Sequence, residues 1–351
     1  MKKNLLITSL SPGTGKTTFT IALAQKFRLD GLNVGYFKPI TDRTEDTDAA
    51  NAKAVLGLDD DLSVICPVLI TNYEYDMEES QKDEITDKIS KAYKQLKDKY
   101  DFLIIESCQT VNHLAFLSYS APHLAILLNA KIIMIASGRT IDEADSIVLM
   151  AKFIESFEAE IIGGVLTQVP GEFIEYFRTI ICPTLLQKHQ ITMLGLVPDR
   201  PDLVAPTVAE VSNVVGGKII AGKNYVNKLV ETYMVGAMTP ETALKYFRSA
   251  VNKAVITGGD RPQLAIAALE TDTSVLILTG SIMPPAQVLA KAEDRQIPIM
   301  LVSGDTFSTI KTLTSVPIYG TVHSDKDEKL TAWIKFLDEV DCKSIIDSLK
   351  Y

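Results

Sequence analysis

The stretch from Leu5 to Thr18 constrains the fold more than any other part of this chain. It begins with the apolar run Leu5 to Ile7, continues through a turn rich in Ser, Pro and Gly, and ends in Gly-Lys-Thr-Thr. Apolar residues at helical spacing follow as far as Phe27. The pattern predicts a buried strand, a tight loop and a helix, which is the first unit of an α/β fold.

This loop has the composition of a phosphate-binding loop, or P-loop. Successive backbone N–H groups that lead into a helix N-terminus bind phosphate oxygens. We predict that Lys16 reaches the terminal phosphates of a nucleotide and that the hydroxyl of Thr17 binds Mg2+. The cofactor-binding residues predicted in this stretch are Ser11, Gly13, Thr14, Gly15, Lys16, Thr17 and Thr18.

The loop also allows a purely structural interpretation. Gly13 and Gly15 would then serve only the backbone of a tight turn between a strand and a helix. The usual P-loop has its first glycine five residues before the last one, where this chain has Leu10.

Length and charge limit the classes of function. The 351 residues indicate two domains, because single cores stop growing near 250 to 300 residues. A net charge of -9 argues against broad binding of nucleic acid or of an anionic membrane. The four cysteines are widely spaced, which predicts reduced thiols, and we find no apolar run long enough to span a membrane. We expect a cytoplasmic protein without nucleic-acid or membrane partners.

Apolar strands alternate with helical segments through the first two hundred residues. This alternation predicts a P-loop NTPase-type, mostly parallel sheet with helices on both faces. Ligands of such sheets bind beyond the carboxyl ends of the strands. After the strand at 5–7, the predicted strands are 33–39, 101–106, 131–137, 161–167 and 192–198.

A domain boundary is predicted where prolines and charges cluster, in 198–206. We divide the chain into a nucleotide-binding domain, 1–204, and a smaller α/β domain, 205–351, whose end is a helical tail over 325–349. The second domain repeats a strand followed by a glycine turn and a helix, with Asp305 and Thr306 capping one of these helices. Its predicted strands are 254–257, 274–280 and 298–304.

Three residues near the predicted sheet edge are candidates for chemistry. Glu106 ends an apolar strand, where it would support Mg2+ or simply face water. Lys38 follows another strand and would be either an active-site cation or a solvated lysine. Asp48 is a candidate metal ligand, although it and Asp46 also fit an N-cap and a helix-dipole role.

A second glycine turn carries Gly258, Gly259, Asp260 and Arg261. These residues would form a second cofactor-binding site, because Arg261 can hold a phosphate or carboxylate with two hydrogen bonds. Equally, the glycines would allow the turn while Asp260 caps the next helix. Cys108 has no activating neighbour in the sequence and is predicted to be a structural thiol.

Residues 1 to about 200 resemble the dethiobiotin synthetase family. That family has a more widely spaced loop, with Ser9 here in the place of the first glycine, and a Gly-Tyr-x-Lys-Pro strand that matches 35–39. The resemblance implies binding of ATP or another nucleoside triphosphate with Mg2+. It assigns metal binding to Thr17, Asp48 and Glu106, and it assigns catalysis to Lys16, Lys38 and Glu106.

The chain departs from the synthetases in two places. Residues 107–110 replace a glycine-rich loop that holds the substrate. The family's adenine-reading Asn, in a Gly-Val-x-x-Asn strand, is replaced by Thr167, which we keep as a cofactor-binding candidate. The first departure argues against dethiobiotin synthesis, and the second argues against the family's mode of adenine recognition.

Residues from about 205 to 325 resemble the DRTGG domain through the segments 235–238, 257–261 and 278–280. The domain order is similar to the N-terminal regulatory part of long phosphotransacetylases, and no acetyl-transfer domain is expected after the tail. The resemblance implies a regulatory protein that binds ATP and Mg2+, with slow ATP hydrolysis, a second small-molecule effector and a homodimer or higher homo-oligomer. The alternative is an ATP-dependent ligase that activates a small carboxylate or carbamate.

Overall fold

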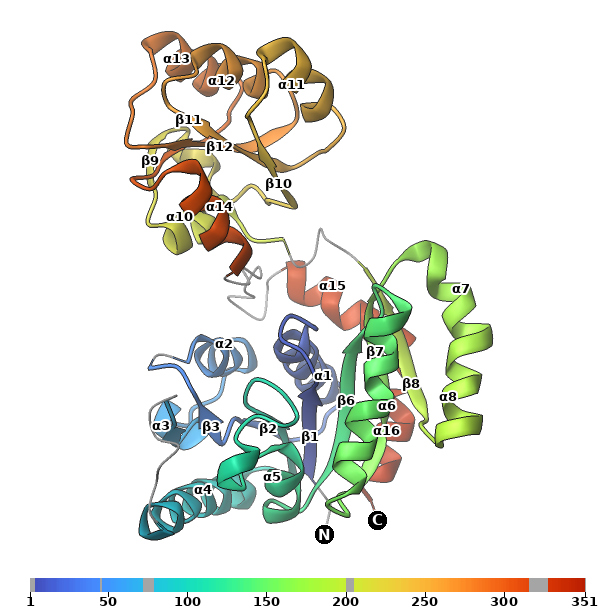
Figure 1. Cartoon of the computed structure of the whole chain (residues 1–351). Helices are drawn as coiled ribbons and strands as arrows, with labels where there is room; N and C mark the ends of the chain where they lie inside the picture. The colour runs from blue at the N-terminus through green and yellow to red at the C-terminus, as the bar shows by residue number, and fades with distance from the viewer. Residues whose placement is uncertain (1–3, 45, 72–78, 200–204, 316–327, 351) are drawn as a thin grey trace. The chain divides into compact units, whose positions relative to one another are not determined.

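The computed structural model describes residues 4–44, 46–71, 79–199, 205–315 and 328–350 (Figure 1). The chain divides into two compact units. The first comprises Met1–Asp199 together with Val322–Tyr351, and the second comprises Arg200–Thr321. The predicted boundary between residues 204 and 205 adjoins a stretch that lies outside the described residues.

The first unit is built on a six-stranded sheet with the order β2-β5-β1-β6-β7-β8. Every neighbouring pair in it is parallel. Its strands are β1 (Asn4–Ser9), β2 (Val34–Phe37), β5 (Phe102–Glu106), β6 (Ala130–Ser137), β7 (Ile161–Val169) and β8 (Met193–Pro198). The predicted parallel sheet is confirmed. The short strands β3 (Ile40–Thr41) and β4 (Val68–Leu69), which the sequence analysis did not predict, pair beside it.

Helices cover both faces of this sheet. The connection from β1 to β2 runs across the sheet in one direction, and that from β6 to β7 runs in the other. Because such crossovers are right-handed, α1 and α6 lie on opposite faces, and Figure 1 shows α6 in front of β6 and β7. The helices are α1 (Lys16–Leu29), α2 (Thr47–Leu56), α3 (Leu62–Ile65), α4 (Glu79–Lys99), α5 (Ala121–Leu127), α6 (Ile141–Glu155), α7 (Ile174–Tyr176) and α8 (Cys182–His189).

The C-terminal tail packs on the first unit, not on the second. It contains α15 (Glu328–Phe336) and α16 (Cys342–Ser348). Val340 forms an isolated antiparallel bridge with Gly195 of β8, and the Asp341 N–H donates to the carbonyl of Leu194 at 2.7 Å. The tail's buried side chains, Leu337, Val340, Ile345 and Leu349, belong to the first core. This corrects the assignment of the tail to the domain 205–351, because the tail packs against α1 and β8 of the first unit.

The second unit has a five-stranded sheet with the order β10-β11-β12-β13-β9. Only β9 is antiparallel to its neighbour. Two apolar clusters form its core. Its strands are β9 (Lys218–Ala221), β10 (Thr232–Val235), β11 (Lys253–Gly258), β12 (Thr273–Thr279) and β13 (Ile299–Leu301). Its helices are α10 (Val208–Val215), α11 (Pro240–Phe247), α12 (Pro262–Leu269), α13 (Ala286–Asp294) and α14 (Thr306–Ser315).

The predicted cap before α14 is present, because Asp305 Oδ1 accepts from the Ser308 N–H at 2.8 Å. Among the described residues of both units, no helix combines the length and apolar character that crossing a membrane requires.

Candidate functional site

The loop between β1 and α1 places both of its glycines in the left-handed region. Gly13 has φ 80° and Gly15 has φ 79°. A Cβ built on Gly15 would meet no atom within 4 Å, so its backbone conformation, not lack of space, demands glycine there. Of the predicted loop residues, Ser11 is exposed, Thr14 is buried and Thr18 is half-buried in the first turn of α1.

Lys16 turns its ammonium toward the segment that follows β5. Its Nζ donates to the main-chain carbonyls of Ser107, Cys108 and Gln109 at 2.7, 3.1 and 2.9 Å. Burial lowers the pKa of Lys16, partly offset by the negative charge of Glu106. The acceptors are neutral oxygens, so an anionic oxygen brought to the loop would be a stronger partner for this ammonium.

Thr17 and Glu106, two predicted metal residues, meet beside the loop. Thr17 Oγ1 donates to Glu106 Oε1 at 2.6 Å, and the hydroxyl of Tyr36 donates to Oε2 at 2.9 Å. Glu106 is 1% exposed. Burial raises the pKa of this carboxyl, opposed by the charges of Lys38 and Lys16. A hydroxyl and a carboxylate are the hard oxygen donors that Mg2+ prefers.

Lys38 is held between two carboxylates. Its Nζ lies 2.8 Å from Asp46 Oδ2 and 2.9 Å from Asp48 Oδ2, and the residue is 5% exposed. Burial alone would lower the pKa of Lys38, but the charges of Glu106, Asp48 and Asp46 outweigh it and raise that pKa well above its usual value. The N-cap role of Asp46 is observed, because its Oδ1 accepts from the Ala49 N–H at 2.7 Å.

The predicted metal residues are therefore divided. Thr17 and Glu106 come together, whereas the carboxylate of Asp48 is bound to Lys38. No group of three or more His, Cys, Asp or Glu side chains is arranged to hold a metal ion in the part of the chain that the structure describes. This sparse protein donor set suits Mg2+, which usually retains water and takes phosphate oxygens alongside one or two carboxylates.

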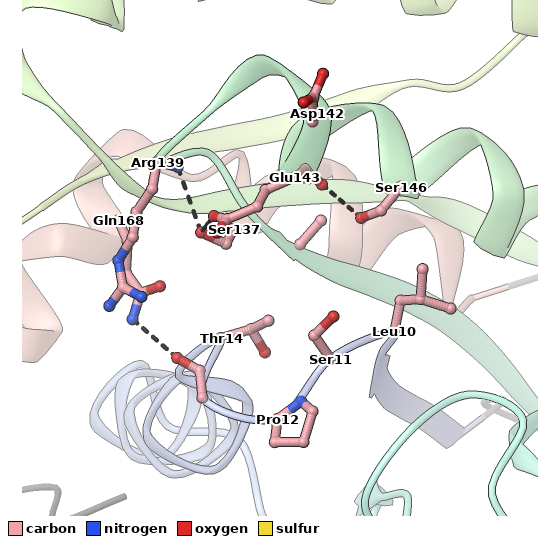
Figure 2. A pocket seen from close by; sticks show the side chains of 12 residues that line it. Leu10, Ser11, Pro12, Thr14, Ser137, Arg139, Asp142, Glu143, Ser146 and Gln168 are labelled. Atoms are coloured by element: carbon pink, nitrogen blue, oxygen red, sulfur yellow. Dashed lines mark hydrogen bonds between the residues drawn. The ribbon is translucent and has the colours of Figure 1, made fainter. Parts of the chain in front are cut away.

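A cavity of about 310 Å3 opens between the loop and the start of α6 (Figure 2). Two buried oxygens on its wall have no hydrogen-bond partner, namely Thr14 Oγ1 and Gln168 Oε1. Such orphaned groups are costly unless a ligand or water satisfies them. The lining residues are Leu10, Ser11, Pro12, Gly13, Thr14, Ala136, Ser137, Arg139, Asp142, Glu143, Ser146 and Gln168.

Gln168, and not the predicted Thr167, lies on the wall of this cavity. The hydroxyl of Thr167 donates to the carbonyl of Thr14 at 2.6 Å, so this residue holds the loop in place through its main chain. Gln168 has φ 58°, and its Nε2 donates to the carbonyl of Gly13 at 2.9 Å, which orients Oε1 as a free acceptor. The signal was in the sequence, since a Gly-Val-x-x pattern starting at Gly164 places the fifth residue at Gln168.

Arg139 is a second lining residue that sequence reasoning missed. Figure 2 shows its side chain extending from the turn before α6 toward Gln168. No motif in the sequence distinguished it from other surface arginines.

The glycine turn of the second unit lies at the end of β11. A Cβ on Gly259 would come within 2.0 Å of the Ile282 carbonyl oxygen, so a close approach of two loops requires this glycine. Arg261 is the N-cap residue of α12, and no side chain caps that helix, which leaves the predicted Asp260 cap unformed. Gly258 ends the strand, and both Asp260 and Arg261 are exposed.

Cys108, the predicted structural thiol, is buried. Burial raises its pKa to about 11, aided by the charge of Asp42, so the unreactive thiol form dominates at neutral pH.

A family model described as an AAA domain matches residues 3–207. The chain belongs to this family. A model described as a DRTGG domain matches residues 210–316, so both predicted domain types are confirmed. The chain combines a P-loop domain of parallel α/β architecture with a DRTGG domain.

Curated relatives agree with this pairing. The chain is 25% identical to a phosphate acetyltransferase of Nitratidesulfovibrio vulgaris over 367 residues, which cover 98% of this chain and 51% of the relative. It is 43% identical to the ATP-dependent dethiobiotin synthetase BioD of Methanocaldococcus jannaschii over 110 residues, covering 29% of this chain and 50% of the relative. The chain thus spans about half the length of the curated relatives it matches.

Among solved structures, the septum site-determining protein MinD of Pyrococcus horikoshii, complexed with Mg-ADP, aligns with a TM-score of 0.38 and 21% identity. The alignment covers 58% of this chain and 84% of that protein.

Proposed function

We propose that this chain is a nucleotide-binding regulatory protein. A nucleoside triphosphate with Mg2+ binds at the loop between β1 and α1, and the DRTGG unit responds to a second small molecule. The observation that carries the proposal is the environment of Lys16, whose ammonium stands at the loop and donates to the neutral carbonyl oxygens of residues 107–109. A phosphate brought there gains a charged donor without first having to break an ion pair.

Different loop residues are proposed to bind the phosphates and the metal ion. The main chain from Gly13 to Thr18 supplies N–H groups at the start of α1, where the helix dipole also favours an anion. Thr17 and Glu106 would hold Mg2+, which would neutralise charge on the phosphates. Asp48 remains a predicted third ligand.

The cavity beside the loop suits the nucleoside part of the ligand. Its volume of about 310 Å3 is of the size of small-ligand pockets, and its wall offers the free acceptor Gln168 Oε1. An acceptor at this place suits a base that carries an amino group, as adenine does, and we propose ATP as the nucleotide.

Calorimetry on the purified chain tests the proposal. Mg-ATP is titrated into the wild type, into Lys16→Met and into Lys26→Met, a matched control on the same helix whose ammonium pairs with Asp338. We expect binding by the wild type and the control and a loss of at least about tenfold for Lys16→Met. Absence of binding by the wild type, or equal affinity of the two lysine variants, would refute the proposal.

Hydrolysis is expected to be slow. Lys16, Lys38 and Glu106 are the predicted catalytic residues, but Lys38 is already neutralised by two carboxylates. Positioning and charge stabilisation suffice for phosphoryl transfer, and a neutralised Lys38 would supply less of the second. Steady-state phosphate release from Mg-ATP, compared with that of Lys38→Met, measures this contribution.

A ligase that activates a small carboxylate or carbamate is the alternative. The 43% identity to a dethiobiotin synthetase over 110 residues favours it. ATP turnover that rises strongly with one member of a panel of small carboxylates would support it, and a flat response would count against it.

The second unit and the assembly complete the proposal. Gly258, Gly259, Asp260 and Arg261 are proposed to contact the second effector, because Arg261 is exposed at the start of α12. The homodimer or higher oligomer is tested by sedimentation with and without Mg-ATP. Acetyl transfer is not assigned to this chain.

A further inference from the structure

The segment 107–110, which follows β5, is held in an unusual way. It is anchored to β1 at both ends, because the Ser107 N–H donates to Ile7 O at 3.1 Å and the Val111 N–H donates to Ser9 O at 2.7 Å. Between these anchors its three carbonyls at 107, 108 and 109 accept from one side chain, the ammonium of Lys16. One lysine therefore holds all three of these carbonyls, and the Ser107 hydroxyl donates in addition to Thr8 Oγ1 at 2.9 Å.

A second attachment links the same segment to the loop after β3. Gln109 Nε2 donates to Asp42 Oδ2, and Cys108 Sγ lies 3.9 Å from Asp42 Oδ1. Gln109 is exposed and Cys108 is buried. The buried thiol thus lies in the segment whose carbonyls Lys16 holds.

The proposed function gives Lys16 a competing partner. An ammonium binds phosphate oxygens more strongly than neutral carbonyls, because both partners of the hydrogen bond are then charged. When Lys16 turns to the phosphates, its three carbonyl acceptors lose their donor, and buried carbonyls without partners are unfavourable. The segment must then move to water or to a new donor.

We propose that nucleotide binding at the loop releases segment 107–110 from Lys16 and uncovers Cys108. This inference rests on the proposed function and adds a conformational change that nucleotide binding would cause. The segment starts directly after Glu106, so a conformational change there is coupled to occupancy of the phosphate site. A state-dependent surface of this kind is what a regulatory protein needs in order to report its nucleotide.

The labelling rate of Cys108 tests the proposal. The chain carries Cys66→Ser, Cys182→Ser and Cys342→Ser, so that a maleimide reports only Cys108. We expect saturating Mg-ATP to increase the rate at least about tenfold, because the buried thiol becomes accessible to the reagent. AMP, which lacks the phosphates that Lys16 would reach, should leave the rate unchanged.

Lys16→Met supplies the decisive comparison. Without nucleotide it should label as fast as the wild type does with Mg-ATP, whereas Lys26→Met should stay slow. Equal or slower labelling with Mg-ATP in a protein that calorimetry shows to bind it, or slow labelling of Lys16→Met, would overturn this inference and leave the proposed function intact. If the triple variant fails to fold, peptide mass mapping of labelled wild-type chain gives the same rates.

Discussion

At the residue scale, Thr17 is the side chain whose hydroxyl joins the loop to the strand-end acid. Replacing Thr17 by Val keeps the shape and the main-chain N–H but removes the donor to Glu106 Oε1. We expect Mg-ATP affinity to fall by about tenfold or more, ~1.4 kcal/mol, because the hydroxyl proposed to bind Mg2+ is lost. Thr18→Val is the matched control and should bind normally, because Thr18 is proposed to contact phosphate only through its main-chain N–H, which the substitution keeps. Equal affinities of the two variants in calorimetry would contradict the role of Thr17.

The Gln168 amide donates to the loop through Nε2 and offers an acceptor through Oε1. One substitution separates these two roles. Gln168→Lys retains a donor for the Gly13 carbonyl but removes the free acceptor Oε1. We expect affinity for Mg-tripolyphosphate to be preserved and the extra affinity for Mg-ATP to fall by about tenfold. Inosine triphosphate, which lacks the 6-amino donor, should bind the wild type as weakly as Mg-ATP binds the variant.

The control for this prediction is Ser146→Ala, which alters a different wall of the cavity. It should keep the wild-type preference for Mg-ATP. A preference that survives Gln168→Lys would remove Gln168 from base recognition.

Asp46 gives the site a defined pH dependence. Burial acts to raise the pKa of Asp46, but the Lys38 charge and the hydrogen bonds it accepts outweigh burial and lower it below 3.8. A carboxyl with a lowered folded pKa contributes stability above its ordinary pKa and loses it as pH falls through the folded value. Asp46→Asn, which still caps α2, should cost ~1–3 kcal/mol at about pH 7.

The cost should be smaller at about pH 3 than at about pH 7, because the contribution of the ion pair is lost as pH falls toward the lowered folded pKa of Asp46. Urea unfolding at the two pH values measures it. A cost that stays constant with pH would show that packing, not the ion pair with Lys38, explains the effect.

At the scale of elements, strands could be predicted from the sequence where their residue pattern matches their burial in the fold. All six strands of the first sheet were predicted because each is a continuous apolar run, as strands buried on both faces require. The strands β3 and β9 were not, because two- to four-residue edge strands leave little periodicity.

The site was predicted in part for the same reason. Thr17 and Glu106 meet because the carboxyl ends of neighbouring parallel strands share one edge. Arg139 and the tether of Lys16 to 107–109 depend on side-chain directions in loops, which no spacing rule supplies. The tail was recognised as helical, but its partner was not, since amphipathic pattern identifies a buried face without identifying what covers it.

The tail yields an element-scale prediction. Ile345 of α16 is 0% exposed within the first core. Ile345→Ala should lower the stability of the first unit by ~2–5 kcal/mol, because a buried aliphatic side chain is truncated. Lys343→Ala on the same helix should have little effect. Hydrogen exchange resolved by unit would show the loss in the first sheet only, and a loss confined to the second sheet would contradict the packing.

At the scale of the whole molecule, each of the two units has its own hydrophobic core and its own proposed ligand. Each unit buries its own apolar clusters, and the nucleotide site draws all its described residues from the first. Regulation therefore requires that the two ligands change each other's affinity, and such coupling is reciprocal. Coupling can be measured by asking whether a ligand of one unit stabilises only that unit.

Mg-ATP should raise the thermal stability of the first unit selectively. A ligand that binds only the folded state stabilises it by RT ln(1 + [L]/Kd), ~2.7 kcal/mol at a hundredfold excess over Kd. Calorimetric scanning of the full chain should resolve two transitions, and only the one lowered by Ile345→Ala should shift upward with Mg-ATP. The other should be lowered by Gly259→Ala, whose Cβ would clash with the Ile282 carbonyl. A common shift of both transitions would show that the nucleotide stabilises the two units as one, as strong coupling between them requires.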